Sequence, residues 1–237
     1  MRRTFLISVM VLVLGLPTLG RTATWEIDTN HTSAQFAIRH LMVSTVRGNF
    51  PKVTGTVNLD EQDVTKSTIE ATIDVASVNT GIEKRDDHLR SPDFFNVAQY
   101  PHITFKSKKV EKAGDDKLKI TGDFTLHGVT KEIVLDYEGS LTPIKDPMGK
   151  TRLGGMATTK IKRSDFGLTW NRALETGGVT VGDEVSIILD IELTQAGATA
   201  AATPASAATA VKQAADQAID KAVDTVADKA LDAAAGQ

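Results

Sequence analysis

The chain has 237 residues and a formal net charge of −3, and it contains no cysteine. Its 27 Lys and Arg residues nearly balance 30 Asp and Glu residues, and no basic face is clustered, which argues against a nucleic-acid-binding protein. The absence of cysteine excludes disulfides, thiol catalysis, thiolate metal sites and an N-terminal lipid-modified cysteine.

Residues 1–23 have the pattern of a secretory signal peptide. Arg2 and Arg3 supply the positive start, residues 5–16 form an apolar core, and Pro17 ends it. An uncleaved membrane anchor is the alternative, but the apolar run is short for a span. The sequence therefore predicts an exported, periplasmic protein.

Residues 24–195 are predicted to form one β domain. Apolar residues recur at every second position in about eight stretches, which is the period of half-buried strands, and no helical stripe is present. The stretches are Trp25–Ile38 (one strand or a broken pair), Val53–Leu59, Ile69–Val75, Ile103–Ser107, Leu118–Leu126, Val129–Tyr137, Leu153–Ile161 and Val185–Leu193.

Between these strands lie several irregular segments. Residues 41–47 are ambiguous between a short helix and a loop. Residues 81–91 are charged and predict one or two helical turns that end before Pro92. The aromatic residues that follow, up to residue 100, are expected to plug one end of the sheet. Residues 143–150 are predicted as a loop, and residues 164–182 as irregular.

The segment from Leu118 to Tyr137 is the clearest hairpin. Two alternating runs flank His127-Gly128, and a two-residue loop there pairs Leu126 with Val129. One face of this hairpin is apolar and the other is polar, so the sheet must curl or stack to cover its dry face.

A sandwich and a closed barrel both satisfy this pattern. Because the strands are long and joined mainly in hairpin order, we expect an all-β, eight-stranded antiparallel up-and-down barrel with a short inserted helix. The interior of such a barrel is either filled by side chains or holds one small ligand, and composition does not choose between the two.

After residue 195 the composition changes. Residues 196–210 are rich in Ala, Thr, Gly, Ser and Pro, and predict a flexible linker. Residues 211–237 predict an amphipathic, Ala-rich helix with a narrow apolar stripe and acids every four residues. A solvated appendage is one interpretation, and a helix partner or homo-oligomer is the sharper one. The acidic residues of this helix and its lack of aromatic side chains argue against binding to an anionic membrane surface.

No local motif indicates catalysis. None of the five histidines lies two or four positions from another, and no metal, nucleophile-elbow or nucleotide-binding motif is present, although a metal site assembled from distant strands stays open. We therefore predict no cofactor and no enzyme. The stronger hypothesis is that an apolar barrel interior binds an apolar molecule.

Four segments resemble the YceI family of exported proteins. They are Asp28-x-x-His31-Thr32-x-x-x-Phe36-x-x-x-His40 followed by Gly48-x-Phe50, Arg85-x-x-His88-Leu89-x-Ser91-x-Asp93-Phe94-Phe95 leading to Tyr100-Pro101 and Phe105-x-Ser107, Gly122 to Thr130, and Arg163 to Gly167. Together they cover about residues 24 to 194, and the Ala-rich tail lies outside the resemblance.

The resemblance implies a lipocalin-like barrel that carries an isoprenoid-type or other long-chain lipid, with the polar head near one mouth. Residues expected to line or plug the barrel are Phe36, Ile38, Phe50, Ile73, Phe94, Phe95, Phe105, Phe124, Phe166, Trp170, Ile187 and Leu189. Candidates for the polar head are His31, His40, Arg85, His88 and His127. The alternatives are an enzyme that uses histidines at the mouth on a lipid-like substrate, and an envelope interaction protein that uses its C-terminal helix.

Overall fold

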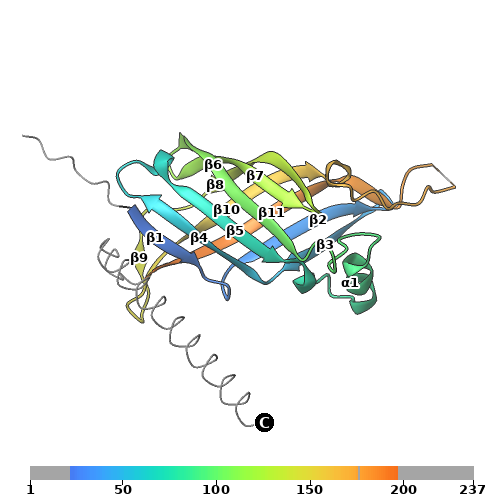
Figure 1. The fold of residues 1–237 in the computed structure, drawn as a ribbon, viewed down its shortest axis with the longest axis horizontal. Helices are drawn as coiled ribbons and strands as arrows, with labels where there is room; N and C mark the ends of the chain where they lie inside the picture. The colour runs from blue at the N-terminus through green and yellow to red at the C-terminus, as the bar shows by residue number, and fades with distance from the viewer. Residues whose placement is uncertain (1–21, 176, 197–237) are drawn as a thin grey trace, which may run out of the picture. The chain divides into compact units, whose positions relative to one another are not determined.

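The computed structural model describes residues 22–175 and 177–196 (Figure 1). The predicted signal peptide, apart from its last two residues, and nearly all of the predicted linker and C-terminal helix therefore lie outside the described residues. The first strand begins at Thr22.

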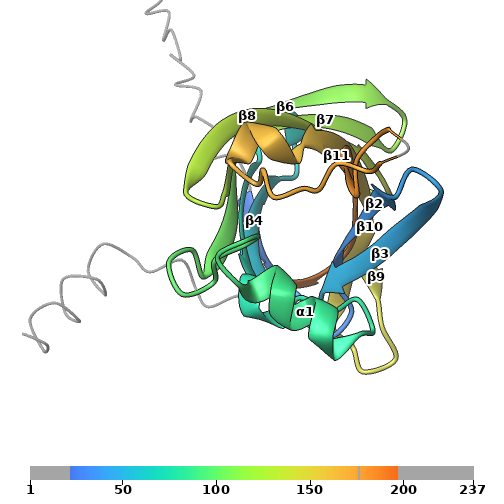
Figure 2. The ribbon, with the colours of Figure 1, turned by 90° about the vertical axis from the view of Figure 1, so that its right-hand side faces the viewer.

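Eight strands of the described chain close into an antiparallel barrel. Their order around it is β11-β1-β4-β5-β6-β7-β8-β10, and β10 pairs with β11 to close the ring (Figures 1 and 2). These strands are β1 (Thr22–Ile27), β4 (Val53–Asp60), β5 (Thr68–Asp74), β6 (His102–Gly114), β7 (Lys117–Leu126), β8 (Val129–Glu138), β10 (Thr151–Lys162) and β11 (Val181–Gln195). The predicted barrel is confirmed, and the sandwich alternative is wrong.

Three further strands extend this ring. β2 (Ser33–His40) and β3 (Ser44–Phe50) form a hairpin, and β9 (Ile144–Lys145) pairs with the start of β10. Strand β11 is long enough to pair with β1 near its end and with β2 along its first ten residues. The first alternating stretch is thus a broken pair, interrupted at residues 28–32.

Two irregular predictions need correction. Residues 41–43 form a turn and β3 begins at Ser44, so the short-helix option for residues 41–47 is wrong. The loop at residues 143–150 contains the two-residue strand β9. β9 has only two residues, and β3 is held by its pairing with β2 rather than by a strong alternation of its own.

The hairpin of β7 and β8 has the predicted register. Leu126 pairs with Val129 across the loop, and Leu118 pairs with Tyr137 at the far end. His127 and Gly128 have φ values of 52° and 75°, which is the left-handed conformation that two-residue hairpin loops require.

The inserted helix is α1 (Glu83–Arg90), and it ends before Pro92 as predicted. It lies at one end of the barrel (Figures 1 and 2). The buried carboxylate of Asp86 anchors it by accepting hydrogen bonds from the backbone N–H and the hydroxyl of Thr80. Arg90 donates to the carbonyls of Ala76 and Val78.

The remaining short elements are the 3-10 turns η1 (Val64–Lys66), η2 (Val75–Ser77) and η3 (Arg163–Phe166). None of the described helices has the length and apolar character needed to cross a membrane. Outward side chains of neighbouring strands form ion pairs, such as Lys119 with Asp136 and Lys160 with Glu184, so the outer face of the barrel is polar. The apolar face therefore lies inside the barrel.

Candidate functional site: the barrel interior

The barrel encloses a cavity of about 280 Å³. Its lining comes from every strand of the closed ring, from the β2–β3 hairpin, from α1 and from connecting segments such as the one after α1. The lining reaches from Leu59 and Leu193 at one end to Arg163 and Leu168 at the end where α1 lies. Apolar side chains dominate it, so the cavity suits an apolar guest.

Many lining side chains are only half-buried although they point inward. Phe36, Ile187, Leu189 and Ile191 belong to this class, whereas Leu126, close to the closed end of its hairpin, is buried. In a filled core these side chains would meet others across the barrel and lose nearly all exposure. Their remaining exposure indicates that part of the lumen is empty.

The cavity is long and narrow. Leu153 and Arg163 both line it and are ten residues apart, about 33 Å along a strand and roughly 25 Å along the axis of a barrel with ordinary strand tilt. The volume of about 280 Å³ is near the lower end of the range for small-molecule sites. This shape fits a single slender chain better than a bulky ring system.

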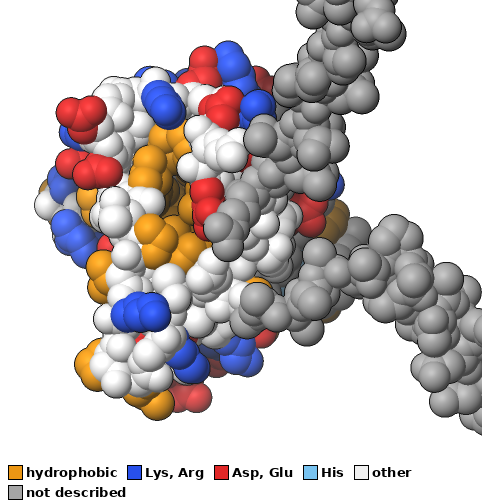
Figure 3. Space-filling model, turned by 90° about the vertical axis from the view of Figure 1, so that its left-hand side faces the viewer, with side chains coloured by type: hydrophobic (Ala, Val, Ile, Leu, Met, Phe, Trp, Pro, Cys, Tyr) orange, Lys and Arg blue, Asp and Glu red, His pale blue; other side chains and the backbone are white. Residues whose placement is uncertain are grey.

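One end of the barrel is visibly hollowed. Seen from the left-hand side of Figure 1, apolar side chains lie inside the hollow, and acidic and basic side chains surround it (Figure 3). The lining residues of the neighbouring strand ends are Leu59, Leu153 and Leu193.

Aromatic residues gather at the opposite end. The ring of Phe95 packs edge-on against Phe50, with centroids 5.6 Å apart. The ring centroid of Phe94 lies 5.0 Å from the ring centroids of both His88 and Trp170. The segment after α1 therefore presents rings toward the lumen and toward the loop that follows η3, as the expected plug requires.

Ten of the twelve residues expected to line or plug the barrel contribute to the lining; Phe166 and Trp170 do not. Phe166 is fully buried and packs edge-on against Phe124, with centroids 5.5 Å apart. Trp170 packs against the rings of Phe94 and His88. Their contact with a ligand stays a prediction.

None of the five residues expected to bind a polar head contributes to the lining. Arg85 donates from Nε and Nη2 to the hydroxyl and carbonyl of Thr80, and so fixes the start of α1. His88 Nε2 lies 2.9 Å from a carboxylate oxygen of Asp93. His40 ends β2 beside the turn to β3.

His127 occupies the loop between β7 and β8. Its Nδ1 lies 3.3 Å from the carbonyl of Phe166, and its ring packs on Tyr100. Its Nε2 is buried and has no hydrogen-bond partner among the described residues. This position makes His127 part of the packing between the hairpin and η3.

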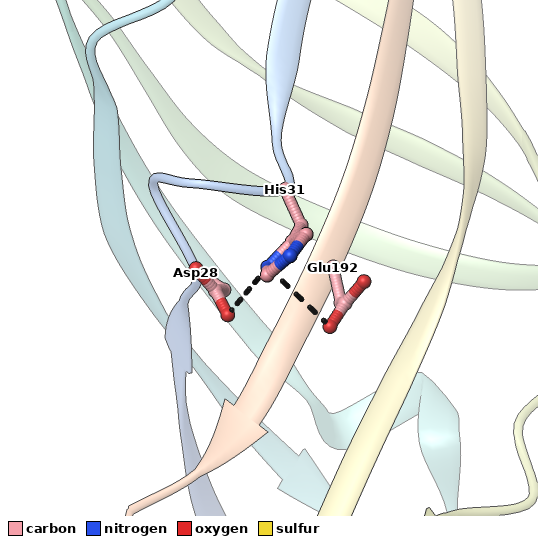
Figure 4. A group of neighbouring side chains, drawn as sticks. All are labelled: Asp28, His31 and Glu192. Carbon is pink, nitrogen blue, oxygen red and sulfur yellow. Dashed lines mark hydrogen bonds and ion pairs between the residues drawn. The ribbon is translucent and has the colours of Figure 1, made fainter. Parts of the chain in front are cut away.

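His31 lies away from the lumen, in a charged group with Asp28 and Glu192 (Figure 4). Ligand atoms of these three residues lie within 4.8 Å of one another, as a metal site would require. However, Nη1 of Arg152 already lies 2.6 Å from Asp28 and forms a second ion pair with Glu192. A metal cation there would be repelled by this guanidinium and would have to compete with it for both carboxylates.

The same group holds the pKa of the Asp28 carboxyl well below its usual value. The first cause is the hydrogen bond from Arg152, and the second is the hydrogen bond from His31. Arg152 also pairs with Asp146, in the loop before β10, at 2.7 Å. We interpret the group as a structural tie between the β1–β2 connection, β11 and this loop.

Arg163 lines the lumen although the strand pattern did not predict it there. Among the described residues it contributes the only charged side chain to the lining, and it is buried. Its Nε donates to the carbonyl of Gly182 and its Nη1 to that of Leu168, and burial lowers the pKa of its guanidinium. It therefore fixes the irregular segment between β10 and β11 at this end of the lumen.

Other missed lining residues follow from strand parity alone. They occupy the same strand faces as the predicted residues, so the alternation of apolar and polar residues was enough to identify them. These residues are Ile27, Val57, Leu59, Ile69, Ile103, Ile120, Leu135, Leu153, Ile161 and Ile191.

Comparison with known proteins gives a consistent result. The model of the YceI-like domain matches residues 25–193. The UPF0312 protein VPA0850 of Vibrio parahaemolyticus is 35% identical over 168 residues, which are 70% of this chain and 88% of that protein.

Two solved structures have the same fold. The Campylobacter jejuni YceI protein is 37% identical, with a TM-score of 0.57, and the match covers 67% of this chain and 90% of that one. A polyisoprenoid-binding domain from Saccharophagus degradans has a TM-score of 0.53 over 74% of this chain and all of its own. At 17% identity it supports the fold alone.

Proposed function

Because this chain belongs to the YceI-like family, we propose that it is a non-catalytic carrier that holds a long-chain lipid inside its barrel. The observation that carries the proposal is the long, narrow lumen whose inward apolar side chains keep free surface. Each lipid methylene that leaves water for such a surface contributes about 0.8 kcal/mol before the costs of association. A single hydrocarbon chain can thus be held without any chemistry.

We propose an isoprenoid-type chain as the ligand class. The slender shape of the lumen supports a single chain, and one protein of the same fold is described as a polyisoprenoid-binding domain. Arg163, the one charged group that residues 22–175 and 177–196 contribute to the lining, already donates to two backbone carbonyls. The apolar tail therefore supplies most of the binding energy in this proposal, and the polar head only a small part.

We further propose that the protein works in the periplasm. The basic start and apolar core of residues 1–23 support export, since a secretory signal has this composition. Comparing the mass of the protein recovered from the periplasmic fraction with the mass calculated for the full chain would test this proposal, because removal of a signal peptide lowers the mass; full-length protein found only in the cytoplasmic fraction would contradict it.

Organic extraction of the purified protein followed by mass spectrometry tests the carrier proposal. We expect a long-chain lipid at about one molecule per chain, and uptake of added prenyl alcohols by lipid-free protein in native mass spectrometry. Protein that repeatedly contains no lipid and takes up none would refute the proposal.

Alanine substitutions at His31, His40 and His88 distinguish a carrier from an enzyme. All three side chains lie outside the lining, so a carrier should keep its binding stoichiometry in each variant. An enzyme that uses these histidines would lose turnover of its lipid substrate instead.

For residues 211–237 we propose a helix partner or self-association through the apolar stripe. The regular spacing of Val211, Ala215, Ile219, Ala222, Val226 and Ala230 supports it. A chain that lacks residues 196–237 should then show a smaller assembly in analytical ultracentrifugation. An unchanged assembly size and unchanged partners would contradict this role.

A further inference from the structure

The turn that joins β2 to β3 exposes three consecutive apolar residues, Leu41, Met42 and Val43. Met42 is 52% exposed and Val43 is 78% exposed. Single exposed apolar residues are ordinary on protein surfaces, but a run of three at a hairpin tip is a solubility liability unless it has a function.

The backbone of this turn is also unusual. Leu41 and Met42 have φ values of 49° and 61°, and the N–H of Val43 donates to the carbonyl of His40. Asn and Gly are the residues that favour such a turn, because large side chains are strained at positive φ. Strain and exposed apolar surface at the same residues indicate a function other than stability.

Hydrogen bonds hold the turn in this conformation. Arg39 donates from Nη2 to the carbonyl of Met42 and from Nη1 to the hydroxyl of Thr45. The N–H of Leu41 donates to the carbonyl of Thr180 in the neighbouring loop, over 2.8 Å. The three apolar side chains are therefore presented on a fixed support.

The charge of this hairpin is opposite to that of the whole chain. Residues 33–50 contain Arg39, His40 and Arg47 and no acidic residue, whereas the chain has a net charge of −3. Arg39 and Arg47 are exposed, and within the described part of the chain neither forms an ion pair with a carboxylate. An apolar tip beside unpaired cations complements an anionic lipid surface.

We propose that the β2–β3 turn docks the protein on an anionic lipid bilayer by inserting Leu41, Met42 and Val43 among the head groups. Arg39 and Arg47 then lie at the level of the phosphates. Attachment of this kind is peripheral and reversible, because only one turn enters the interface. It does not depend on what the lumen holds.

Vesicle sedimentation with the chain that lacks the predicted signal peptide, residues 1–23, tests the proposal. The vesicles are phosphatidylcholine alone or mixed with phosphatidylglycerol, and the variant is Leu41→Asn with Met42→Gly. We expect the parent to bind the anionic vesicles, and the double variant to bind them at least roughly tenfold more weakly. Since these residues suit the turn, the variant should unfold at the same temperature or higher.

Two further variants serve as controls. Ile144→Ser with Met148→Ser removes two exposed apolar side chains from β9 and the turn that follows it. β9 pairs with the start of β10, far from the β2–β3 turn, so this variant should keep vesicle binding. Arg47→Gln should weaken binding to anionic vesicles roughly fivefold at low salt and should matter little at high salt.

Three results would overturn the proposal. The first is a parent protein that binds no anionic vesicles, and the second is a double variant that binds them as well as the parent. The third is a concentration-dependent dimer that the double variant loses in analytical ultracentrifugation, which would assign the turn to a second copy of the chain. A substitution that blocks the lumen should leave vesicle binding intact, so failure of the carrier proposal is recognised separately.

Discussion

Narrowing the lumen at Ala71 should weaken lipid binding without unfolding the barrel. Ala71 lies in the middle of β5, lines the cavity, and is half-buried because its side chain borders free space. In Ala71→Phe the ring adds six carbons. If half of them take the place of ligand, about three methylenes are displaced, which costs roughly 2.4 kcal/mol, or about fiftyfold in Kd.

The assay is titration of lipid-free protein with a prenyl alcohol, followed by calorimetry or native mass spectrometry. Thr72→Phe is the matched control, since Thr72 is the next residue on β5 and does not line the cavity. We expect the control to bind like the parent, and both variants to melt cooperatively. A folded Ala71→Phe protein with undiminished affinity would refute the idea that the lipid occupies this part of the lumen.

Three further predictions concern stability. Arg152 keeps the pKa of Asp28 below its usual value near 4, so the pair contributes stability above about pH 4 that is lost as the pH falls. Arg152→Met should therefore flatten the pH dependence of the free energy of unfolding, measured in urea between pH 7 and 3. An unchanged pH profile would contradict this role of Arg152. Gly128→Ala should lower the free energy of unfolding by about 1–3 kcal/mol, because φ of Gly128 is 75° and the added Cβ would lie 2.5 Å from Tyr100 Cε1. An unchanged melting temperature would show that the loop does not require glycine at this position. Phe166→Ala should cost about 3–5 kcal/mol in denaturant titration because the ring is fully buried, and a cost below about 1 kcal/mol would be inconsistent with that packing.

The sheet could be predicted from the sequence because its signals are local. Alternation assigns each side chain to a face, and the two-residue loop at His127-Gly128 fixes the register of the hairpin without any distant contact. The same parity placed seven of the ten correctly predicted lining residues, including Ile187 and Leu189 on β11, whereas Phe50, Phe94 and Phe95 were named from the family resemblance.

The polar candidates were harder to place because they sit on connections. The direction of Arg85 and His88 is set by Thr80 and Asp93, and that of His31 by a group assembled from β11 and the loop before β10. No periodicity reports such contacts. Arg163 was named as part of a family segment but not as a lining residue, since only the folded barrel brings the end of β10 next to the lumen.

The long closing strand also bears on how the chain folds. Trp25 of β1 pairs with Gln195 of β11, and Arg152 of β10 pairs with Thr194, so the last strand seals the ring by pairing with both the first strand and the strand before it. Such non-local pairing slows folding, because the loop entropy is lost before the contacts form. The barrel cannot be completed until the ribosome has made residue 195, and until then β1 has only β4 as its neighbour. A nascent chain of this kind stays open, with its apolar face uncovered, for most of its synthesis.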